Sequence, residues 1–395
     1  MPAFKSATFC ILFLFFLASG CDQTFAQDSG DIPSVSDKRA AELDRKIPEI
    51  IEEHGVNTAG LGVIKNGELV WTGYFGEQSP GVPATRETLF NVASITKTIT
   101  AEAILRMVDD GKLDLDESMA PYWVDPDLKE DPRHELLTPR MTLTHSSGFL
   151  NWRNIDRDRK LRFVNDPGSI FGYSGEGFEY LMNYAKIKLE THPNELIKKY
   201  VFDPMGMEDA SYVVDKSTFD RLARAKDKTG KSYGPYCRPG GGCPREGRYF
   251  ASDDMIINVE SYAKFLISVM NEEGLSKELI EDRNRVQIVK PADEQTVICA
   301  TDVDQVCPVT QGYGLGWEVI DYGNDKVLSH SGSDWSEFTL GYFYTNSKDG
   351  LIIFFNAPNS FAVGAMYDTL VQMDPDSPML GGYGRWLAYL ASQEN

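Results

Sequence analysis

A serine and a lysine three positions apart, Ser94 and Lys97 in "NVASITKTIT", have the types and spacing of a reacting pair. They stand where a loop enters a strongly helical segment, so one helical turn places both side chains on the same face. A serine hydroxyl is a poor nucleophile until a base removes its proton, and a lysine can do this where its ammonium form is disfavoured. Backbone N–H groups at a helix start also favour a developing oxyanion. The alternative interpretation is a helix-capping serine beside a solvated lysine.

The spacing by itself is weak evidence, because Ser-x-x-Lys is expected by chance in a chain of 395 residues. A second copy runs from Ser261 to Lys264, inside an amphipathic helical segment. We predict a surface or capping role for Ser261. The significance of Ser94 therefore depends on other motifs in the chain.

Further motifs follow in a fixed order: "LLTPRMTLTHSSGF" (136–149), "FGYSGEGFEYL" (171–181), "GYGLGW" (312–317) and "VLSHSGSDW" (327–335). With Ser94 and Lys97, these motifs resemble the serine β-lactamase and penicillin-binding protein superfamily. The resemblance is to the branch that contains class C β-lactamases, D-Ala-D-Ala carboxypeptidases and related esterases. It covers about residues 37–372 and implies an α+β fold of two lobes. One lobe is an antiparallel sheet flanked by terminal helices, and the other is mainly helical.

The resemblance also implies roles for three side chains. Ser94 would be the nucleophile that forms an acyl-enzyme, and Lys97 would be its proton-abstracting partner. Tyr173 would match the family's tyrosine, which serves as a shared general base and later as general acid. A nearby lysine cation favours the phenolate form of a tyrosine, which is the physical requirement for that role.

A strand motif would complete the site. His330 and Gly332 match the family's Lys- or His-x-Gly triad, and the backbone N–H groups of Ser94 and Ser333 would form the oxyanion hole. Because these donors are backbone groups, the side chain of Ser333 matters little. A side chain at Gly332 would crowd a substrate lying along the strand edge.

Two departures from the family pattern bear on the substrate. Gly175 in "YSG" stands where the family often has an Asn that positions substrate amides and the lysine. A lysine in the strand triad would hold a permanent cation against a substrate carboxylate, whereas His330 is mostly neutral at pH 7. Both departures favour the family's esterases and peptidases over its dedicated β-lactamases.

The resulting prediction is a serine hydrolase that acts through an acyl-enzyme on Ser94. Its substrates would be esters, small amides, short D-amino-acid peptides or β-lactams, and no cofactor or metal is expected. The alternative is a non-catalytic relative that binds or senses a penicillin-like or peptidoglycan-like ligand, and Gly175 keeps that alternative open.

Composition and charge limit the class of molecule that this protein is expected to bind. The net charge of -20 and the pI of about 4.7 argue against a nucleic-acid partner, because phosphate binding needs clustered Lys and Arg. The sequence contains no phosphate-binding loop, dinucleotide fingerprint or metal-ligand spacing. We therefore expect a small-molecule or short-peptide substrate.

The first 26 residues are predicted to be a secretory signal, because a basic residue precedes a short apolar run. The end of that run, "LASGC", resembles a lipoprotein cleavage site with Cys21 as the acylated residue. The competing prediction is cleavage after "TFA", which would release Gln27. In either case the protein would work outside the cytoplasm, in the periplasm or anchored to a membrane through lipid. Residues 27–36 are predicted to be a tether, and residues 37–395 the hydrolase domain.

Four cysteines remain outside the leader, and an exported protein favours two disulfides, with three pairings open. Short spacings favour Cys237–Cys243 and Cys299–Cys307. A zinc site is the alternative, although no His-rich spacing accompanies these cysteines.

Patterning predicts helices and strands in separate parts of the chain. Residues 37–55 are predicted to form a helix capped by Asp37 and kinked or broken at Pro48, and residues 59–76 a hairpin turning at Asn66-Gly67. Helices are expected after Ser94, over 175–190 and over 258–271, within a helical lobe of about 110–300. Strands are expected in "DKVLSHSG", "EFTLGYFYT" and "LIIFFNA", followed by helices from near Phe361 and over "GRWLAYLAS".

Several ring-bearing residues flank the motifs. His145 is predicted to have a structural role in a packed turn. Trp152, Tyr236, Tyr313 and Trp335 either line the pocket or fill the core.

Overall fold

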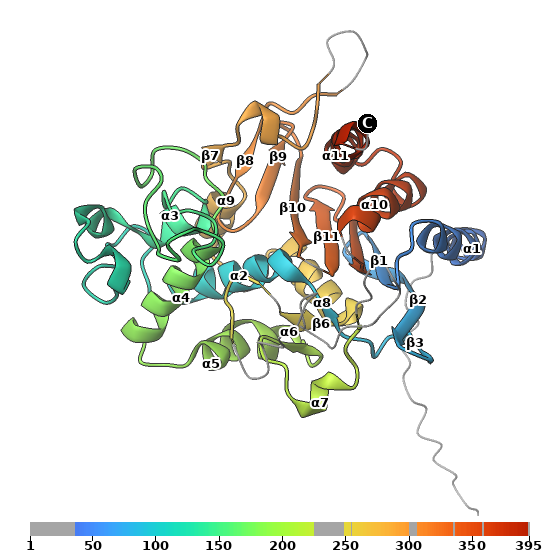
Figure 1. Ribbon diagram of the computed structural model, residues 1–395, viewed down its shortest axis with the longest axis horizontal. Helices are drawn as coiled ribbons and strands as arrows, with labels where there is room; N and C mark the ends of the chain where they lie inside the picture. Colours follow the sequence, from blue (N-terminus) through green and yellow to red (C-terminus); the bar gives the residue numbers. More distant parts are fainter. Residues whose placement is uncertain are drawn as a thin grey trace, which may run out of the picture. The chain divides into compact units, whose positions relative to one another are not determined.

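The computed structural model describes residues 36–224, 249–253, 255–299, 306–334, 336–357 and 359–393 (Figure 1). Outside these ranges lie the predicted leader with Cys21, the predicted tether apart from Ser36, and the predicted Cys237–Cys243 disulfide, together with Tyr236 and Trp335. The predicted Cys299–Cys307 disulfide is formed. Among the helices described, none is long and apolar enough to cross a membrane.

A nine-stranded antiparallel sheet joins the two ends of the chain. In spatial order its strands are β3 (Val82–Pro83), β2 (Glu68–Ser79), β1 (Thr58–Lys65), β12 (Gly350–Asn356), β11 (Glu337–Tyr344), β10 (Lys326–Ser333), β9 (Glu318–Asp321), β8 (Thr310–Tyr313) and β7 (Ile288–Val289). The register of β1 on β12 runs from Thr58 opposite Asn356 to Ile64 opposite Gly350. The prediction of one antiparallel sheet built from both chain ends is confirmed. The short strands β7 to β9, which extend it, were not predicted.

The turn between β1 and β2 is the one that the sequence indicates. Asn66 and Gly67 have φ values of 52° and 78°, the left-handed conformation that a two-residue hairpin turn requires at both positions. Such a turn follows the right-handed twist of the strands and sets the pairing of Lys65 with Glu68 and of Ile64 with Leu69, beyond which the register shifts at a bulge.

Three helices cover one face of the sheet, and one helix covers the other (Figure 1). On the first face α1 (Asp37–Glu53) and α11 (Met379–Gln393) pack against α10 (Asn359–Met373), and on the second α8 (Val259–Met270) lies across β1, β11 and β12. Each face has its own apolar core. The site described below lies on the α8 side, where the helical lobe is attached.

Helix α1 differs in detail from its prediction. It runs unbroken through Pro48, and Ser36, not Asp37, occupies the position before its first turn. Leu43, Ile47 and Ile51 are buried against the sheet side of this helix. Burial of this stripe offsets the cost of an internal proline, so the helix continues.

The helical lobe surrounds α2 (Thr96–Asp109), which α4 (Gly175–Lys188) and α5 (Pro193–Ile197) contact (Figure 1). Its shorter helices are η1 (Ala93–Ile95), η2 (Pro126–Leu128), η3 (Pro132–Leu136), α3 (Pro139–Leu143), η4 (Lys198–Phe202), α6 (Asp203–Met205), α7 (Lys216–Phe219), α9 (Lys277–Arg283) and η5 (Ala292–Glu294). A small sheet of β4 (Phe90–Asn91), β6 (Ile256–Ile257) and β5 (Ala210–Ser211) was not predicted, because two-residue strands leave no alternating pattern. Nearly all of α2 is buried, so this helix is a fixed platform for whatever stands at its start.

Candidate active site

Ser94 and Lys97 form a contact pair at the start of α2. Lys97 Nζ donates a hydrogen bond to Ser94 Oγ at 2.9 Å. Lys97 is 0% exposed, and Ser94 is half-buried. The residues that cap η1 and α2 are Val92 and Ile95. The interpretation as a capping serine with a solvated lysine is therefore wrong.

The backbone immediately before Ser94 is strained and held in place. Ala93 has a φ of 45°, a left-handed conformation that residues with a Cβ seldom adopt. The side chain of Asn91 accepts a hydrogen bond from the Ala93 N–H at 2.9 Å, and Thr339 Oγ1 donates to the Val92 carbonyl at 2.9 Å. Such strain persists only where the surroundings impose it, and here it sets the direction of the Ser94 side chain.

Strand β10 offers one uncovered edge to this serine. β11 pairs with β10 from Val327 to Ser333, whereas β9 pairs with it only from Lys326 to Ser329. The remaining half of β10 lies against η1. The backbone of residues 330–333 therefore runs beside η1, which carries Ser94, and Ser333 is exposed.

At Gly332, strand β10 lies close to the backbone of Val92 and Ser94. A Cβ added there would lie 2.3 Å from the Val92 carbonyl oxygen, 2.3 Å from Thr339 Oγ1 and 3.1 Å from Ser94 N. The sequence prediction was that a side chain at Gly332 would crowd the substrate. The structure shows that it would collide first with the protein's own backbone, so glycine is required to bring the Ser94 N–H to the strand.

Tyr173 is held beside the pair by two neighbours. Lys97 Nζ lies 5.0 Å from the centroid of the Tyr173 ring. The ring of His145 packs on that of Tyr173 with centroids 4.2 Å apart, and His145 Nδ1 accepts a hydrogen bond from the Ser174 N–H at 3.1 Å. Ser174 then caps α4 through the Gly177 N–H. His145 thus has the structural position predicted for it, and it fixes the loop that carries Tyr173.

His330 points into the protein. It is 3% exposed, Tyr313 Oη donates to its Nε2 at 2.9 Å, and its Nδ1 lies 2.7 Å from the Ser331 carbonyl oxygen, to which it donates. Burial, reinforced by the positive charge of Lys97, lowers the pKa of His330 to about 3. The imidazole is therefore neutral at pH 7, in agreement with the expectation from the sequence. Its role in substrate binding stays a prediction.

Two residues that the sequence did not suggest complete the surroundings of Lys97. Lys97 Nζ donates to the Ser252 carbonyl at 2.6 Å. The Ser252 N–H and hydroxyl in turn donate to one carboxylate oxygen of Glu179 at 3.0 and 2.5 Å. Burial raises the pKa of Glu179, while the bonds from Ser252 and the charge of Lys97 act in the opposite direction. Ser252 belongs to no motif in the sequence, and nothing in the residues around Glu179 indicates this contact.

Aromatic rings line the rest of the lysine's environment. The centroids of Trp152 and Phe178 each lie 5.8 Å from Lys97 Nζ, in addition to Tyr173 at 5.0 Å. Trp152 is half-buried and belongs to the site. Tyr313 is buried between the rings of His145 and His330, so it fills the core behind the site.

The second Ser-x-x-Lys copy does not form such a pair. Ser261 is buried, so its predicted surface location is wrong, and its hydroxyl accepts a hydrogen bond from the Asp209 N–H at 3.3 Å. The cap of α8 is Asn258. Lys264 Nζ donates instead to the Gly206 carbonyl at 2.7 Å. Identical spacing thus leads to different chemistry, because the surroundings differ.

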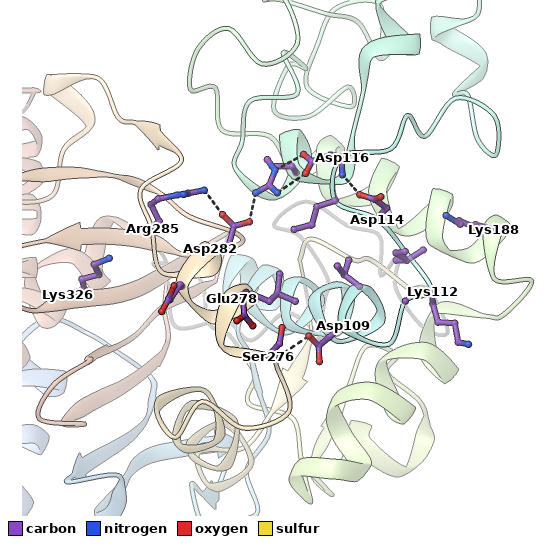
Figure 2. A pocket seen from close by; sticks show the side chains of 17 residues that line it. Asp109, Lys112, Asp114, Asp116, Lys188, Ser276, Glu278, Asp282, Arg285 and Lys326 are labelled. Atoms are coloured by element: carbon purple, nitrogen blue, oxygen red, sulfur yellow. Dashed lines mark hydrogen bonds and ion pairs between the residues drawn. The ribbon is translucent and has the colours of Figure 1, made fainter.

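A charged hollow of about 980 Å³ lies at the opposite end of α2 (Figure 2). Some of its ionic side chains are paired with one another: Arg140 bridges Asp116 and Asp282, and Arg285 also binds Asp282. In the described ranges no cluster of three or more His, Cys, Asp or Glu could hold a metal ion. The hollow contains none of the residues of the Ser94 site.

Comparison with known proteins agrees with this geometry. Residues 43–372 match the beta-lactamase family. Penicillin-binding protein 4 of Amycolatopsis lactamdurans is 21% identical over 73% of this chain and 77% of its own length. The esterase EstB of Burkholderia gladioli is 28% identical over 44% of this chain and 52% of its own length. The D-aminopeptidase of Gluconobacter oxydans is 27% identical over 45% and 36%, respectively.

Solved structures show the same fold. The octameric penicillin-binding protein homologue from Pyrococcus abyssi aligns with a TM-score of 0.66 at 23% identity, covering 84% of this chain and 76% of that one. The penicillin-binding protein from Bacillus halodurans aligns with a TM-score of 0.62 at 19% identity, covering 82% and 99%. The predicted α+β architecture, an antiparallel sheet with a mainly helical lobe, is confirmed. Since the family match spans most of the sequence, the chain belongs to the beta-lactamase family and is a serine hydrolase.

Proposed function

We propose that Ser94 is the nucleophile and that the enzyme hydrolyses carboxylic esters in preference to β-lactams. The observation that carries the proposal is the 2.9 Å contact between Lys97 Nζ and Ser94 Oγ, at the point where Gly332 brings β10 against the Ser94 N–H. A hydroxyl and an amine in contact, beside the Ser94 N–H and the edge of β10 that carries the expected second donor, Ser333, are the groups that acyl transfer needs.

The reaction proceeds in two stages. The reacting form is the one in which Lys97 is a neutral amine: Ser94 Oγ attacks the ester carbonyl, and its proton passes to the Lys97 amine, with Tyr173 sharing the proton. The N–H groups of Ser94 and Ser333 stabilise the oxyanion, the bond to the alcohol breaks, and the alcohol takes up the proton. Water then attacks the acyl-enzyme and gives a proton to the same base, the bond between the acyl carbon and Ser94 Oγ breaks, and the base returns the proton to Ser94 Oγ as the acid leaves.

The preference for esters follows from the charges around the site. The strand triad offers a buried, neutral His330 where a lysine cation would recognise a carboxylate, because the pKa of His330 is about 3. Small amides and D-amino-acid peptides remain candidate substrates, as the names of the related D-aminopeptidase and penicillin-binding protein suggest. We also propose that the mature enzyme works outside the cytoplasm, anchored through lipid at Cys21.

The test compares three substrates and two covalent probes. The wild type should react with a fluorescent fluorophosphonate and a fluorescent penicillin, and Ser94→Ala should react with neither. Hydrolysis of a p-nitrophenyl ester should be fastest, with nitrocefin slow and a D-Ala-D-Ala peptide measured alongside. Rapid nitrocefin turnover would contradict the ranking. No labelling by either probe and no ester turnover would contradict the nucleophile and favour a ligand-binding protein.

A further inference from the structure

Trp152 occupies the space that a side chain at position 175 would need. A Cβ added to Gly175 would lie 2.4, 2.5 and 2.8 Å from three atoms of the Trp152 ring system. Contacts below 3.0 Å are not tolerated, so an Asn at position 175 cannot coexist with the indole in this place. The Asn that the family often has in its tyrosine motif is therefore not merely absent here, because the Trp152 indole fills the space that its side chain would take.

The loop that carries Trp152 is tied residue by residue to the start of α4. The Asn151 side chain accepts a hydrogen bond from the Gly175 N–H at 2.9 Å, and its carbonyl accepts one from the Glu176 N–H at 3.1 Å. Ser174 Oγ donates to the Leu150 carbonyl at 2.8 Å. These bonds leave the backbone on both sides of Trp152 with little freedom to move.

An ion-pair network secures the same loop from the other side. The N–H and the guanidinium of Arg153 both bind the buried Glu176 carboxylate at 2.9 Å, and the guanidinium reaches Asp125 at 2.8 Å. Burial acts to lower the pKa of Arg153, but the hydrogen bonds and the charges of Glu176 and Asp125 outweigh it and raise that pKa, so the guanidinium stays charged. Trp152 is thus a positioned wall of the site, 5.8 Å from Lys97 Nζ at its ring centroid.

We propose that Trp152 determines acyl-group specificity. Where the family often has an Asn whose carboxamide could hydrogen-bond an acylamino substrate, this protein has the apolar face of the Trp152 indole. The enzyme then prefers aliphatic or aromatic acyl groups and discriminates against acyl groups with an amide next to the reacting carbonyl. Burying an amide against the indole leaves its polar atoms without partners, which is unfavourable. The inference rests on the proposed ester hydrolysis at Ser94 and specifies its substrate class.

A pair of esters with the same leaving group tests the inference. The p-nitrophenyl esters of pentanoic acid and N-acetylglycine have acyl chains of equal length, and only the second contains an amide. The wild type should have the higher kcat/KM for the pentanoate. Trp152→Ala combined with Gly175→Asn should shift the kcat/KM ratio toward the N-acetylglycine ester by about tenfold, the scale of one such contact.

Three controls make the outcome decisive. Trp386→Leu on α11, on the opposite face of the sheet, should leave the ratio unchanged. Trp152→Leu keeps Gly175 and all the backbone bonds of the loop, so it should fold even if the double variant does not. Because leucine covers less of the site than the indole and leaves the amide partly hydrated, it should shift the kcat/KM ratio several-fold toward the N-acetylglycine ester. Gly175→Asn alone should lower the activity toward both esters, because the indole must move.

The outcomes separate this inference from the proposed function. Pentanoate turnover that depends on Ser94, with an unchanged ratio in Trp152→Leu and in the folded double variant, overturns the specificity role of Trp152 alone. Absence of pentanoate turnover in the wild type overturns the proposed function, and the inference with it.

Discussion

The two ends of α2 present opposite arrangements of charge. At its start, Lys97 is fully buried and is hydrogen-bonded to a hydroxyl and a backbone carbonyl. At its end, the charged hollow holds arginines whose carboxylate partners surround them, and most of these groups are partly exposed (Figure 2). The size of a hollow therefore does not identify the reacting centre of this protein. The proposed reacting centre rests instead on a buried amine beside a hydroxyl, next to a strained backbone, because such features cost stability and cluster at functional sites.

The largest expected effect is the loss of the buried amine. Lys97→Met keeps the volume of the side chain but removes the proton acceptor, so kcat/KM for a p-nitrophenyl ester should fall by about a thousandfold or more. Arg285→Met at the charged hollow should leave kcat/KM unchanged. Equal effects of the two substitutions on ester turnover would remove the distinction between the two ends of the helix.

A matched pair of glycines gives the next effect. Gly332→Ala places a methyl group 2.3 Å from the Val92 carbonyl oxygen, so the oxyanion donors should be displaced and kcat/KM should fall by about a hundredfold. Gly111→Ala at the hollow end meets nothing within 4 Å but has a φ of 66°. It should therefore lower only the free energy of unfolding, by about 1 kcal/mol. The measurements are kcat/KM for a p-nitrophenyl ester and the free energy of unfolding in urea, for both variants. A Gly332→Ala enzyme with normal kcat/KM would argue against the proposed oxyanion hole.

The neutral histidine behind the site should make the protein sensitive to acid. The pKa of His330 is about 3 in the folded protein against an ordinary value of 6.5. Below pH 6.5 the unfolded chain binds a proton at His330 that the folded chain excludes. The free energy of unfolding therefore decreases as the pH falls from 6.5 toward 3. Between pH 7.5 and pH 5 the loss should be about 2 kcal/mol.

The measurement is urea unfolding of the wild type and His330→Gln at the two pH values. The glutamine can still accept the hydrogen bond from Tyr313 but does not titrate. The decrease in the free energy of unfolding between pH 7.5 and pH 5 should therefore be about 2 kcal/mol smaller in the variant than in the wild type. An identical fall in both proteins would show that His330 is protonated in the folded state.

The smallest effect should come from the ion pairs of the hollow. Arg140→Gln removes contacts to Asp116 and Asp282 that are partly exposed, so the free energy of unfolding should drop by no more than about 1 kcal/mol. The difference from the wild type should shrink further in about 1 M salt, which screens such pairs. A loss of several kcal/mol, or any loss of ester turnover, would mean that the hollow contributes more than surface ion pairs do.

Local sequence patterns predict much of the secondary structure. The turn residues Asn66 and Gly67 predict the hairpin that the structure contains, and the apolar stripe of residues 37–53 predicts α1. The two-residue strands β4 to β6 could not be foreseen, because a period of two cannot be seen in two residues. Ser36 and not Asp37 precedes the first turn of α1, and the helix is not broken at Pro48, because packing against the sheet outweighs the local preference of the proline.

The candidate site likewise has features that the sequence predicts and features that only the structure shows. The sequence alone determined that Ser94 and Lys97 would share a helix face, since their spacing is a single turn. The order of the motifs determined the family. The tertiary structure alone decided that the Ser252 carbonyl would hold Lys97 from 155 positions away, and that Trp152 would fill the space above Gly175. The physical reason is range: hydrogen bonds and periodicity within a helical turn are visible in neighbouring residues, whereas the volume and polarity around a buried amine are set by segments that only folding brings together.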